Sequence, residues 1–326
     1  MKTLPAESKI KSDVLSTIGY TPLIHLSRLF PEANVNIFGK HESLNPGGSI
    51  KDRTALQIIA SALESGELIE GDTVIESSSG NMAIGLAQAC LFYHLQLIVV
   101  VDPNVNAPTV KILKAYGAQV EHVTEPAEEG GYLEARLQRV RELVRETENS
   151  FWPNQYNNPN NPIAHHQTMY EIHRALDGQL DYLFVATSTC GTLMGCARYI
   201  KRHLLRTRVI GVDAVGSVLF GDDKQKRLIP GHGAGKPSPL LDKSQVYDVV
   251  HIDSGECVEG CQRLLQKEAM FCGGSSGGVV SAFKEYLPNI PDGSNCALIL
   301  CDRGERYLET IYNPDWVKEH IHNGTS

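Results

Sequence analysis

One stretch decides how the rest of the chain is interpreted: Asn45-Pro46-Gly47-Gly48-Ser49-Ile50-Lys51-Asp52-Arg53. Asn-Pro followed by two glycines predicts a turn, because proline fixes φ and glycine permits positive φ. The spacing Ser49-x-x-Asp52 predicts a capping box, in which both side chains bind free backbone amides of a new helix. The helix itself is predicted from apolar residues at helical spacing, namely Ala55, Leu56, Ile58, Ile59, Ala62 and Leu63.

Lys51 falls in the first turn of this predicted helix. The positive end of the helix dipole disfavours the charged ammonium form there. A neutral lysine amine attacks carbonyl groups and forms Schiff bases. The alternative is a solvated lysine at a helix start, and the rest of the chain has to decide between the two.

Length and composition set the class of protein. A chain of 326 residues predicts about two domains, since domains run to ~100–200 residues. With 42% hydrophobic and 21% charged residues it resembles an ordinary globular protein, and a net charge of −8 disfavours nucleic acid as a partner. No apolar run approaches the ~20 residues that span a bilayer, and the first residues lack the apolar segment of a signal peptide. We therefore expect a cytoplasmic protein without a membrane or nucleic-acid partner.

The eight cysteines show no CxxC spacing, so buried reduced thiols are expected. Cys257 and Cys261 are one helical turn apart, but no further ligand follows at zinc spacing. We expect no metal site.

Strands alternate with helices along most of the chain, which predicts parallel α/β sheets with right-handed crossovers. Strands are expected at 23–26, 35–40, 73–75, 95–101, 119–123, 182–187, 209–213, 249–252 and 296–301. Helices after the Lys51 helix are expected at 82–93, 109–116, 131–146, 163–176, from 192, 257–268 and 277–286. Residues 150–162 have turn composition and predict a crossing between domains, and the Gly- and Pro-rich residues 215–239 predict a long functional loop.

Two loops between a strand and a helix suit anions. Ser78-Ser79-Gly80-Asn81 offers amides and hydroxyls for a carboxylate or phosphate, although a plain turn is the alternative. Ser188-Thr189-Cys190-Gly191-Thr192 predicts a cradle for a dianionic phosphate, without the pattern of a nucleotide P-loop.

Two glycine-rich motifs suggest other enzymes. Gly273-Gly274-Ser275-Ser276-Gly277 matches the G-x-S-x-G motif of serine hydrolases, but only His320 and His322 follow it, in a polar tail. Gly231-His232-Gly233-Ala234-Gly235 resembles a dinucleotide motif, but no helix is predicted after it. We set both readings aside.

A Schiff-base lysine, a phosphate cradle and a serine at a helix start together describe a pyridoxal phosphate site. The Lys51 stretch, Ser-Ser-Gly-Asn, Gly-Gly-Ser-Ser-Gly and Asp-Arg-Gly-Glu-Arg-Tyr (302–307) resemble, in order, the motifs of the cysteine synthase and cystathionine β-synthase family. The resemblance runs from about residue 13 to 315.

The resemblance implies a role for each matched residue. Lys51 would carry the cofactor and move the Cα proton, Asn81 would contact the ring hydroxyl, and Ser275 would contact the pyridine nitrogen. The phosphate would be held by Ser188, Thr189, Cys190, Gly191 and Thr192. The amino-acid substrate would be bound by Ser78, Ser79, Gly80, Met82, Arg136, Gln155 and Tyr156. A hydroxyl at the pyridine nitrogen makes the ring a weaker electron sink, which favours β-elimination over transamination.

The sequence departs from the usual cysteine synthase pattern. The family's Gly-Thr-Gly-Gly-Thr is Ser-Thr-Cys-Gly-Thr here, Gln-Gln-Phe gives way to Gln155-Tyr156, and residues 130–136 and 216–222 are unlike sulfide-using members. These features resemble the branch that starts 2,3-diaminopropionate synthesis for siderophores and related products. That resemblance implies O-phospho-L-serine and L-glutamate as substrates, with cysteine synthase as the alternative. Arg136 is our candidate for the phosphate, against a solvated helix arginine, and Tyr156 lines the pocket or is a packed aromatic.

The resemblance also implies fold type II, the tryptophan synthase β-like fold of two open, mostly parallel three-layer α/β domains. We expect a smaller domain at 46–155, a larger cofactor-holding domain at 12–45 and 156–315, and tails at 1–11 and 316–326. A homodimer is implied by resemblance only. A non-catalytic homologue is a further alternative, which the presence of Lys51, Asn81 and Ser275 argues against.

Overall fold

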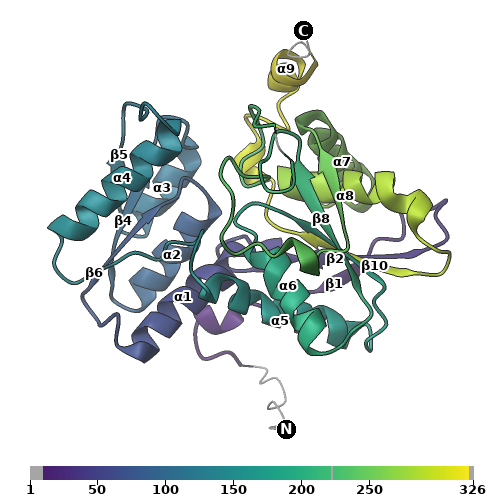
Figure 1. The fold of residues 1–326 in the computed structure, drawn as a ribbon, viewed down its shortest axis with the longest axis horizontal. Coiled ribbons are helices and arrows are strands. Elements are labelled where there is room, and N and C mark those ends of the chain that lie inside the picture. The colour runs from purple at the N-terminus through teal and green to yellow at the C-terminus, as the bar shows by residue number, and fades with distance from the viewer. Residues whose placement is uncertain (1–9, 222, 323–326) are drawn as a thin grey trace.

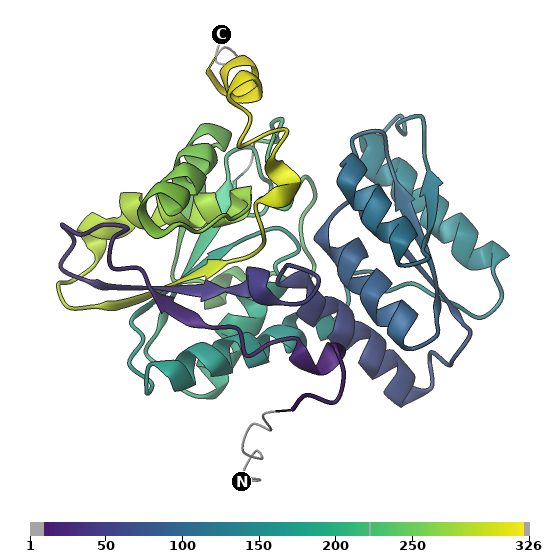
Figure 2. The ribbon, with the colours of Figure 1, turned by 180° about the vertical axis from the view of Figure 1, so that it is seen from behind.

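The computed structural model of the protein describes residues 10–221 and 223–322. Residues 1–9 and 323–326 of the expected tails, and Asp222 of the stretch 216–222, lie outside the described residues. The described chain forms two lobes that lie side by side in both views, each built on its own sheet (Figures 1 and 2).

The larger lobe contains a six-stranded sheet in the order β1-β2-β10-β7-β8-β9. Its strands are β1 (Leu23–His25), β2 (Asn36–His41), β7 (Tyr182–Ala186), β8 (Arg208–Ala214), β9 (Asp248–Ile252) and β10 (Asn295–Leu300). Only the edge strand β1 is antiparallel to its neighbour. Near-continuous apolar runs such as β7 form here because helices cover both faces of the sheet.

Two pairs of helices cover the two faces of this sheet. Tyr182 and Phe184 of β7 pack in the core with α7 (Ser254–Glu268) and α8 (Gly274–Tyr286). The alternate residues Leu183 and Val185 pack instead with α5 (Asn160–Ala175) and α6 (Gly191–Arg202).

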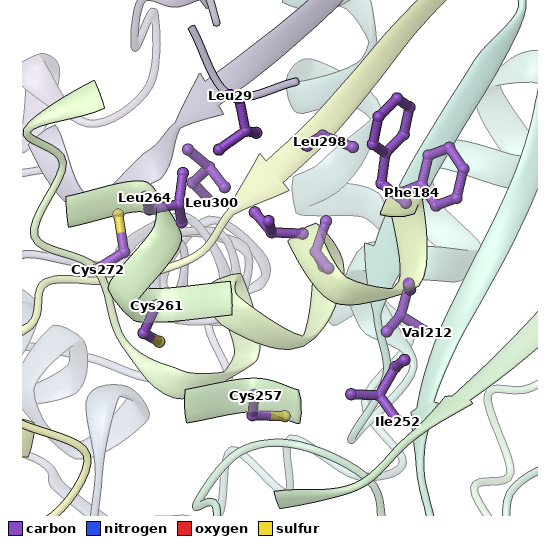
Figure 3. Packing of buried hydrophobic residues seen from close by; sticks show 14 of the residues in the cluster. Leu29, Phe184, Val212, Ile252, Cys257, Cys261, Leu264, Cys272, Leu298 and Leu300 are labelled. Carbon is purple, nitrogen blue, oxygen red and sulfur yellow. The ribbon is translucent and has the colours of Figure 1, made fainter. Parts of the chain in front are cut away.

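Figure 3 shows the first of these cores, with Cys257, Cys261 and Leu264 of α7 against strand residues such as Phe184 and Val212. Helices α7 and α8 touch closely enough that a Cβ at Gly260 would lie 2.0 Å from the Gly277 carbonyl oxygen. A glycine is therefore required at that crossing.

The smaller lobe contains a four-stranded parallel sheet in the order β5-β4-β3-β6. Its strands are β3 (Thr73–Ser77), β4 (Gln96–Val101), β5 (Gln119–His122) and β6 (Ser150–Phe151). One face packs against α1 (Lys51–Ser65), α2 (Asn81–Phe92) and α3 (Ala107–Ala115), and the other against α4 (Gly131–Glu146). Each lobe thus has three layers, and the predicted α/β class is confirmed.

The predicted elements differ from the structure in a few places. Residues 150–162, predicted as a crossing, begin with strand β6, which pairs at the edge of the smaller sheet. Helix α5 begins at Asn160, because prolines are tolerated in a first helical turn. Residues 314–322, partly assigned to a tail, form the short helix α9 (Pro314–Val317) and the π-helical turn η6 (Lys318–His322).

Short 3-10 helices complete the described chain: η1 (Leu15–Thr17), η2 (Glu42–Leu44), η3 (Lys243–Gln245), η4 (Leu287–Asn289) and η5 (Glu305–Tyr307). The carboxyl ends of β3, β7 and β10 carry the loops in which parallel α/β sheets bind ligands. No helix among the described residues is both long and apolar enough to span a membrane.

Candidate active site

The turn before α1 sets the place of Lys51, the first residue of the helix. The predicted reciprocal capping box is wrong. Ser49 Oγ accepts from the Lys51 amide at 3.2 Å, but Asp52 reaches back to the amide of Gly47 at 2.6 Å instead of Ser49. A Cβ at Gly47 would lie 2.5 Å from Asp52 Oδ1, so a larger residue there would displace the Asp52 carboxylate.

One cavity brings together residues that the sequence places far apart. Its lining includes all the residues predicted to hold a cofactor: Lys51, Asn81, Ser188, Thr189, Cys190, Gly191, Thr192 and Ser275. The remaining lining residues were not predicted as site residues: Ile50, Ala186, Pro230, Gly231, Cys301, Asp302 and Tyr307. The cavity lies where the loops after β3, β7 and β10 meet the first turn of α1.

The loop at 188–192 has the geometry of an anion cradle. Gly191 begins helix α6, whose first amides have no partner within the helix. Cys190 has φ of 66°, in the left-handed region that favours glycine. Asn161 Nδ2 donates to Thr189 Oγ1 at 3.0 Å, and the Thr192 hydroxyl lies 3.3 Å from His165 Nε2. The two hydroxyls are therefore held by buried partners beneath the loop.

Lys51 faces this cavity with an unpaired amine. Among the described residues, Lys51 Nζ makes no hydrogen bond and no ion pair. Burial lowers the pKa of the amine, and Cys301, Asp302 and Cys190 oppose that shift. The helix dipole also predicts a lowered pKa for Lys51, but the larger cause in the structure is desolvation.

Asn81 and Ser275 stand at the first turns of two other helices that reach the cavity. Asn81 begins α2, its Nδ2 donates to Asp302 Oδ2 at 2.8 Å, and its buried Oδ1 has no partner among the described residues. Ser275 lies in the first turn of α8 and is buried beside the thiol of Cys301. An unpaired buried oxygen on the cavity wall indicates a missing polar ligand.

The predicted substrate residues do not line this cavity. Ser78 Oγ accepts from the amide of Ala83 at 3.3 Å, which places it at the entry to α2. The side chain of Met82 is buried in the hydrophobic core of the smaller lobe. Gln155 is buried, and its carbonyl oxygen accepts from Asn161 Nδ2, the same group that holds Thr189.

Arg136 and Tyr156 belong to a buried polar cluster around Glu76. Arg136 Nε lies 3.1 Å from Asp102 Oδ2, and the side chain is 13% exposed, so Arg136 is not a solvated helix arginine. Glu76 accepts from Trp152 Nε1 and from the Gln155 amide, both at 3.3 Å, yet burial raises its pKa to about 7. Burial also raises the pKa of Tyr156, which Arg136 opposes.

Sequence reasoning missed two acidic residues here. Asp302 belongs to the 302–307 motif and follows a buried strand adjacent to β7, a position that predicts a site residue. Glu76 stands one residue before the Ser77 end of β3, directly after the apolar pair Val74 and Ile75. Of the described residues in the loop after β8, only Pro230 and Gly231 line the cavity, whereas Ser217 and Leu219, in the stretch 216–222 that differs from sulfide-using members, are buried.

Comparison with known proteins agrees with this geometry. A family model described as pyridoxal-phosphate dependent enzyme matches residues 14–302. The chain is 44% identical over 309 residues to the N-(2-amino-2-carboxyethyl)-L-glutamate synthase of Ralstonia nicotianae, covering 94% of this chain and 91% of the relative. It is 44% identical over 310 residues to the enzyme of the same name from Cupriavidus metallidurans, with 94% and 91% covered.

Solved structures are similar as well. The O-acetylserine dependent cystathionine beta-synthase of Helicobacter pylori has a TM-score of 0.87 and 30% identity, covering 94% of this chain and all (100%) of that one. The cysteine synthase of Entamoeba histolytica has a TM-score of 0.85 and 29% identity, covering 96% and 94%.

The residues present fit pyridoxal phosphate. The cavity offers an unpaired lysine amine for the aldehyde, a helix N-terminus with hydroxyls for the phosphate, and the unpaired Asn81 Oδ1 for the ring. The chain belongs to the pyridoxal-phosphate dependent enzyme family, within its cysteine synthase-like group, and its cofactor is pyridoxal phosphate.

Proposed function

We propose that this transferase replaces the phosphate of O-phospho-L-serine with the amine of L-glutamate and so forms N-(2-amino-2-carboxyethyl)-L-glutamate. The printed names of two relatives at 44% identity support this proposal. The observation that carries it is Arg136, a largely buried cation that lies 3.1 Å from Asp102 and acts on Tyr156 and on Glu76 of β3. A dianionic leaving group needs such a cation, whereas a neutral acetyl ester does not.

We propose the following division of labour. Bound pyridoxal phosphate withdraws electrons from the substrate Cα, which permits loss of the group on Cβ. Lys51 carries the cofactor and moves the Cα proton with its amine. Ser78, Ser79 and Gln155 bind the substrate carboxylate, together with the first amides of α2 at Gly80 to Met82. The loop at 188–192 binds the cofactor phosphate, and Ser275 contacts the pyridine nitrogen.

A direct assay tests the proposed substrates. Purified enzyme is given O-phosphoserine or O-acetylserine, each with L-glutamate or sulfide, and the products are identified by mass. We expect N-(2-amino-2-carboxyethyl)-L-glutamate from O-phosphoserine and glutamate, with phosphate released in equal amount. Product from sulfide alone would make the protein a cysteine synthase, the second candidate, which structural similarity to the Entamoeba histolytica enzyme favours.

Further parts of the proposal concern context. We propose a smaller domain at 46–155 and a larger one at 12–45 and 156–315, a homodimeric assembly, a cytoplasmic location and a role in 2,3-diaminopropionate and siderophore synthesis. Sedimentation of the purified protein tests the dimer. An amine panel offered with O-phosphoserine tests the acceptor.

A further inference from the structure

Asp302 lies where the three cofactor-site segments meet. It follows β10 and is 1% exposed. Its backbone forms an isolated bridge with Ser49, two residues before Lys51, and its carbonyl oxygen accepts from the amide of Gly273, just before α8, at 3.1 Å. Its side chain reaches Asn81 at the start of α2. One residue therefore connects the segments that bear Lys51, Ser275 and Asn81.

The carboxylate of Asp302 has a built surrounding. Its Oδ2 accepts from Asn81 Nδ2 at 2.8 Å and from the hydroxyl of Tyr307 at 2.7 Å, and Arg306 Nη2 lies 3.6 Å away. Its Oδ1 is buried without a partner among the described residues. That oxygen lies against Gly273, where a Cβ would come within 2.2 Å of it, so Gly273 leaves the room that the carboxylate needs.

The bond to Asn81 fixes the direction of the amide. Asn81 belongs to the smaller lobe and Asp302 to the larger one, so this bond crosses between the lobes. Because Asp302 has no donor, only the amide nitrogen of Asn81 pairs with it. The unpaired Asn81 Oδ1 is then left for the cofactor side of the cavity.

Asp302 is also the anion that acts on Lys51. The other titratable groups that act on the amine are Cys301, Cys190 and His165. Burial raises the pKa of both thiols to about 12 and lowers the pKa of His165, so these three groups are uncharged at neutral pH. Of the described groups that act on the amine, the Asp302 carboxylate alone can balance a positive charge on the lysine nitrogen.

We propose that Asp302 is a positioning residue for the cofactor, which orients the Asn81 amide across the two lobes and stabilises a positive charge on the Lys51 nitrogen. This inference rests on the cofactor placement proposed above. The residue acts through Asn81 and Lys51, and the proposal requires no reaction of its own.

A pH titration of the visible absorption of the bound cofactor, recorded without substrate, tests the proposal. Asp302→Asn keeps the size of the side chain and removes its charge, so the titration midpoint should fall by about one pH unit. Arg306→Gln removes the cation 3.6 Å from Asp302, so the midpoint should rise. Asp248→Asn is the matched control, since Asp248 also accepts from a tyrosine, Tyr286, but at the amino end of β9. Its midpoint should equal that of the wild type.

An unchanged midpoint in Asp302→Asn would overturn the proposal, as would shifts of Asp302→Asn and Arg306→Gln in the same direction. If Asp302→Asn fails to fold, Arg306→Gln decides alone, and a midpoint that is lower or unchanged overturns it. A wild type that takes up no cofactor would overturn both the inference and the proposed function. If the variants show these shifts but the wild type does not turn over O-phosphoserine, the inference is supported and only the proposed substrate is overturned.

Discussion

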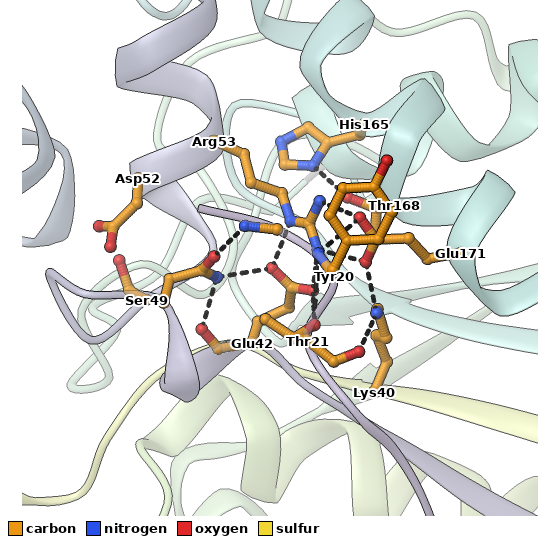
Figure 4. Close-up of polar contacts among 12 residues, drawn as sticks. Tyr20, Thr21, Lys40, Glu42, Ser49, Asp52, Arg53, His165, Thr168 and Glu171 are labelled. Atoms are coloured by element: carbon orange, nitrogen blue, oxygen red, sulfur yellow. Dashed lines mark hydrogen bonds and ion pairs between the residues drawn. The ribbon is translucent and has the colours of Figure 1, made fainter. Parts of the chain in front are cut away.

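Two buried polar clusters lie on either side of the first turn of α1, and they differ in how their charges are matched. In one, Arg53 pairs with Glu42 and Glu171, and Lys40 donates to Glu171 and to the Thr21 carbonyl oxygen (Figure 4). In the other, Lys51 has no partner among the described residues, and Asn81 and Asp302 each leave one buried oxygen unpaired. Arg53 follows Lys51 by two residues, which on a helix puts the two side chains on opposite sides.

The difference separates a structural cluster from a binding cluster. Burial lowers the pKa of both Lys40 and Lys51, so a shifted lysine alone does not identify a site. The first cluster satisfies its charges within the chain and joins α1 to β2 and α5. The second cluster leaves donors and acceptors free to bind a ligand, which is the arrangement expected of a cofactor site.

The largest expected effect comes from breaking the matched cluster. Arg53→Met leaves Glu42 and Glu171 without their main partner, and both carboxylates are 5% exposed or less. Removing one member of a buried ion pair costs about 3–5 kcal/mol of unfolding free energy. Urea denaturation of the wild-type and Arg53→Met apoproteins measures this loss of unfolding free energy. A loss below about 1 kcal/mol would show that the cluster does not hold α1 in place.

Glu76 is an intermediate case, because it is a buried carboxylate whose charge its hydrogen-bond donors stabilise only in part. Its pKa in the folded protein is raised to about 7 from an ordinary 4.5, so between these values the folded protein keeps a proton that the unfolded chain has lost. Stability should therefore fall as pH rises from 4.5 to about 7. Glu76→Gln removes this pH dependence, which changes the free energy of unfolding by up to about 3 kcal/mol at ~1.4 kcal/mol per pKa unit.

Denaturation of wild type and Glu76→Gln at several pH values measures the change. Asp52, whose pKa is also raised to about 7, is present in both proteins and cancels in the difference. A difference in stability that is constant over this window would contradict the assigned pKa of Glu76.

Arg136 extends the comparison to the substrate. Arg136→Gln should raise KM for O-phosphoserine by roughly tenfold or more, because a charge-assisted contact to phosphate contributes about 1.5–3 kcal/mol. KM for O-acetylserine should change little. Steady-state kinetics with both substrates measures the ratio, and an equal effect on both would assign Arg136 to general packing.

The smallest effect is expected from a change at Arg139, on the partly exposed side of α4, the helix that also carries Arg136. Arg139 pairs with Glu121 and Glu142, but its side chain is 31% exposed. Arg139→Gln should cost about 0.2–1 kcal/mol of unfolding free energy and leave the substrate ratio unchanged. It is therefore the matched control for Arg136→Gln. A change of the substrate ratio in Arg139→Gln would mean that helix α4 responds to any loss of charge.

Local patterns in the sequence were sufficient for much of the fold. Helix α4 was predicted with the bounds that the structure has, and the strands β4, β7 and β10 were predicted to within about a residue from their apolar runs. Strand β6 was missed because it is two residues long and lies in a segment of turn composition. The predicted capping box was wrong because the Asp52 carboxylate accepts from the amide of Gly47 instead of the amide of Ser49.

The site was predicted only where its residues carry a local motif. Lys51, the loop at 188–192 and Ser275 follow strands or begin helices, and the structure places them around one cavity. Arg53 and Asp302 had no predicted role, because their partners Glu171 and Asn81 are 118 and 221 positions away in the sequence. Such pairings depend on how the two sheets are brought together, which no short pattern encodes.

The two buried lysines allow the most direct test of the central claim, that the unmatched cluster is the cofactor site. Borohydride reduction of the holoprotein fixes a Schiff base as a stable amine, and peptide mapping then identifies the modified lysine. We predict the adduct on Lys51 and none on Lys40, whose amine is held by Glu171 and Thr21. An adduct on Lys40, or cofactor bound without any reducible link to Lys51, would contradict the account.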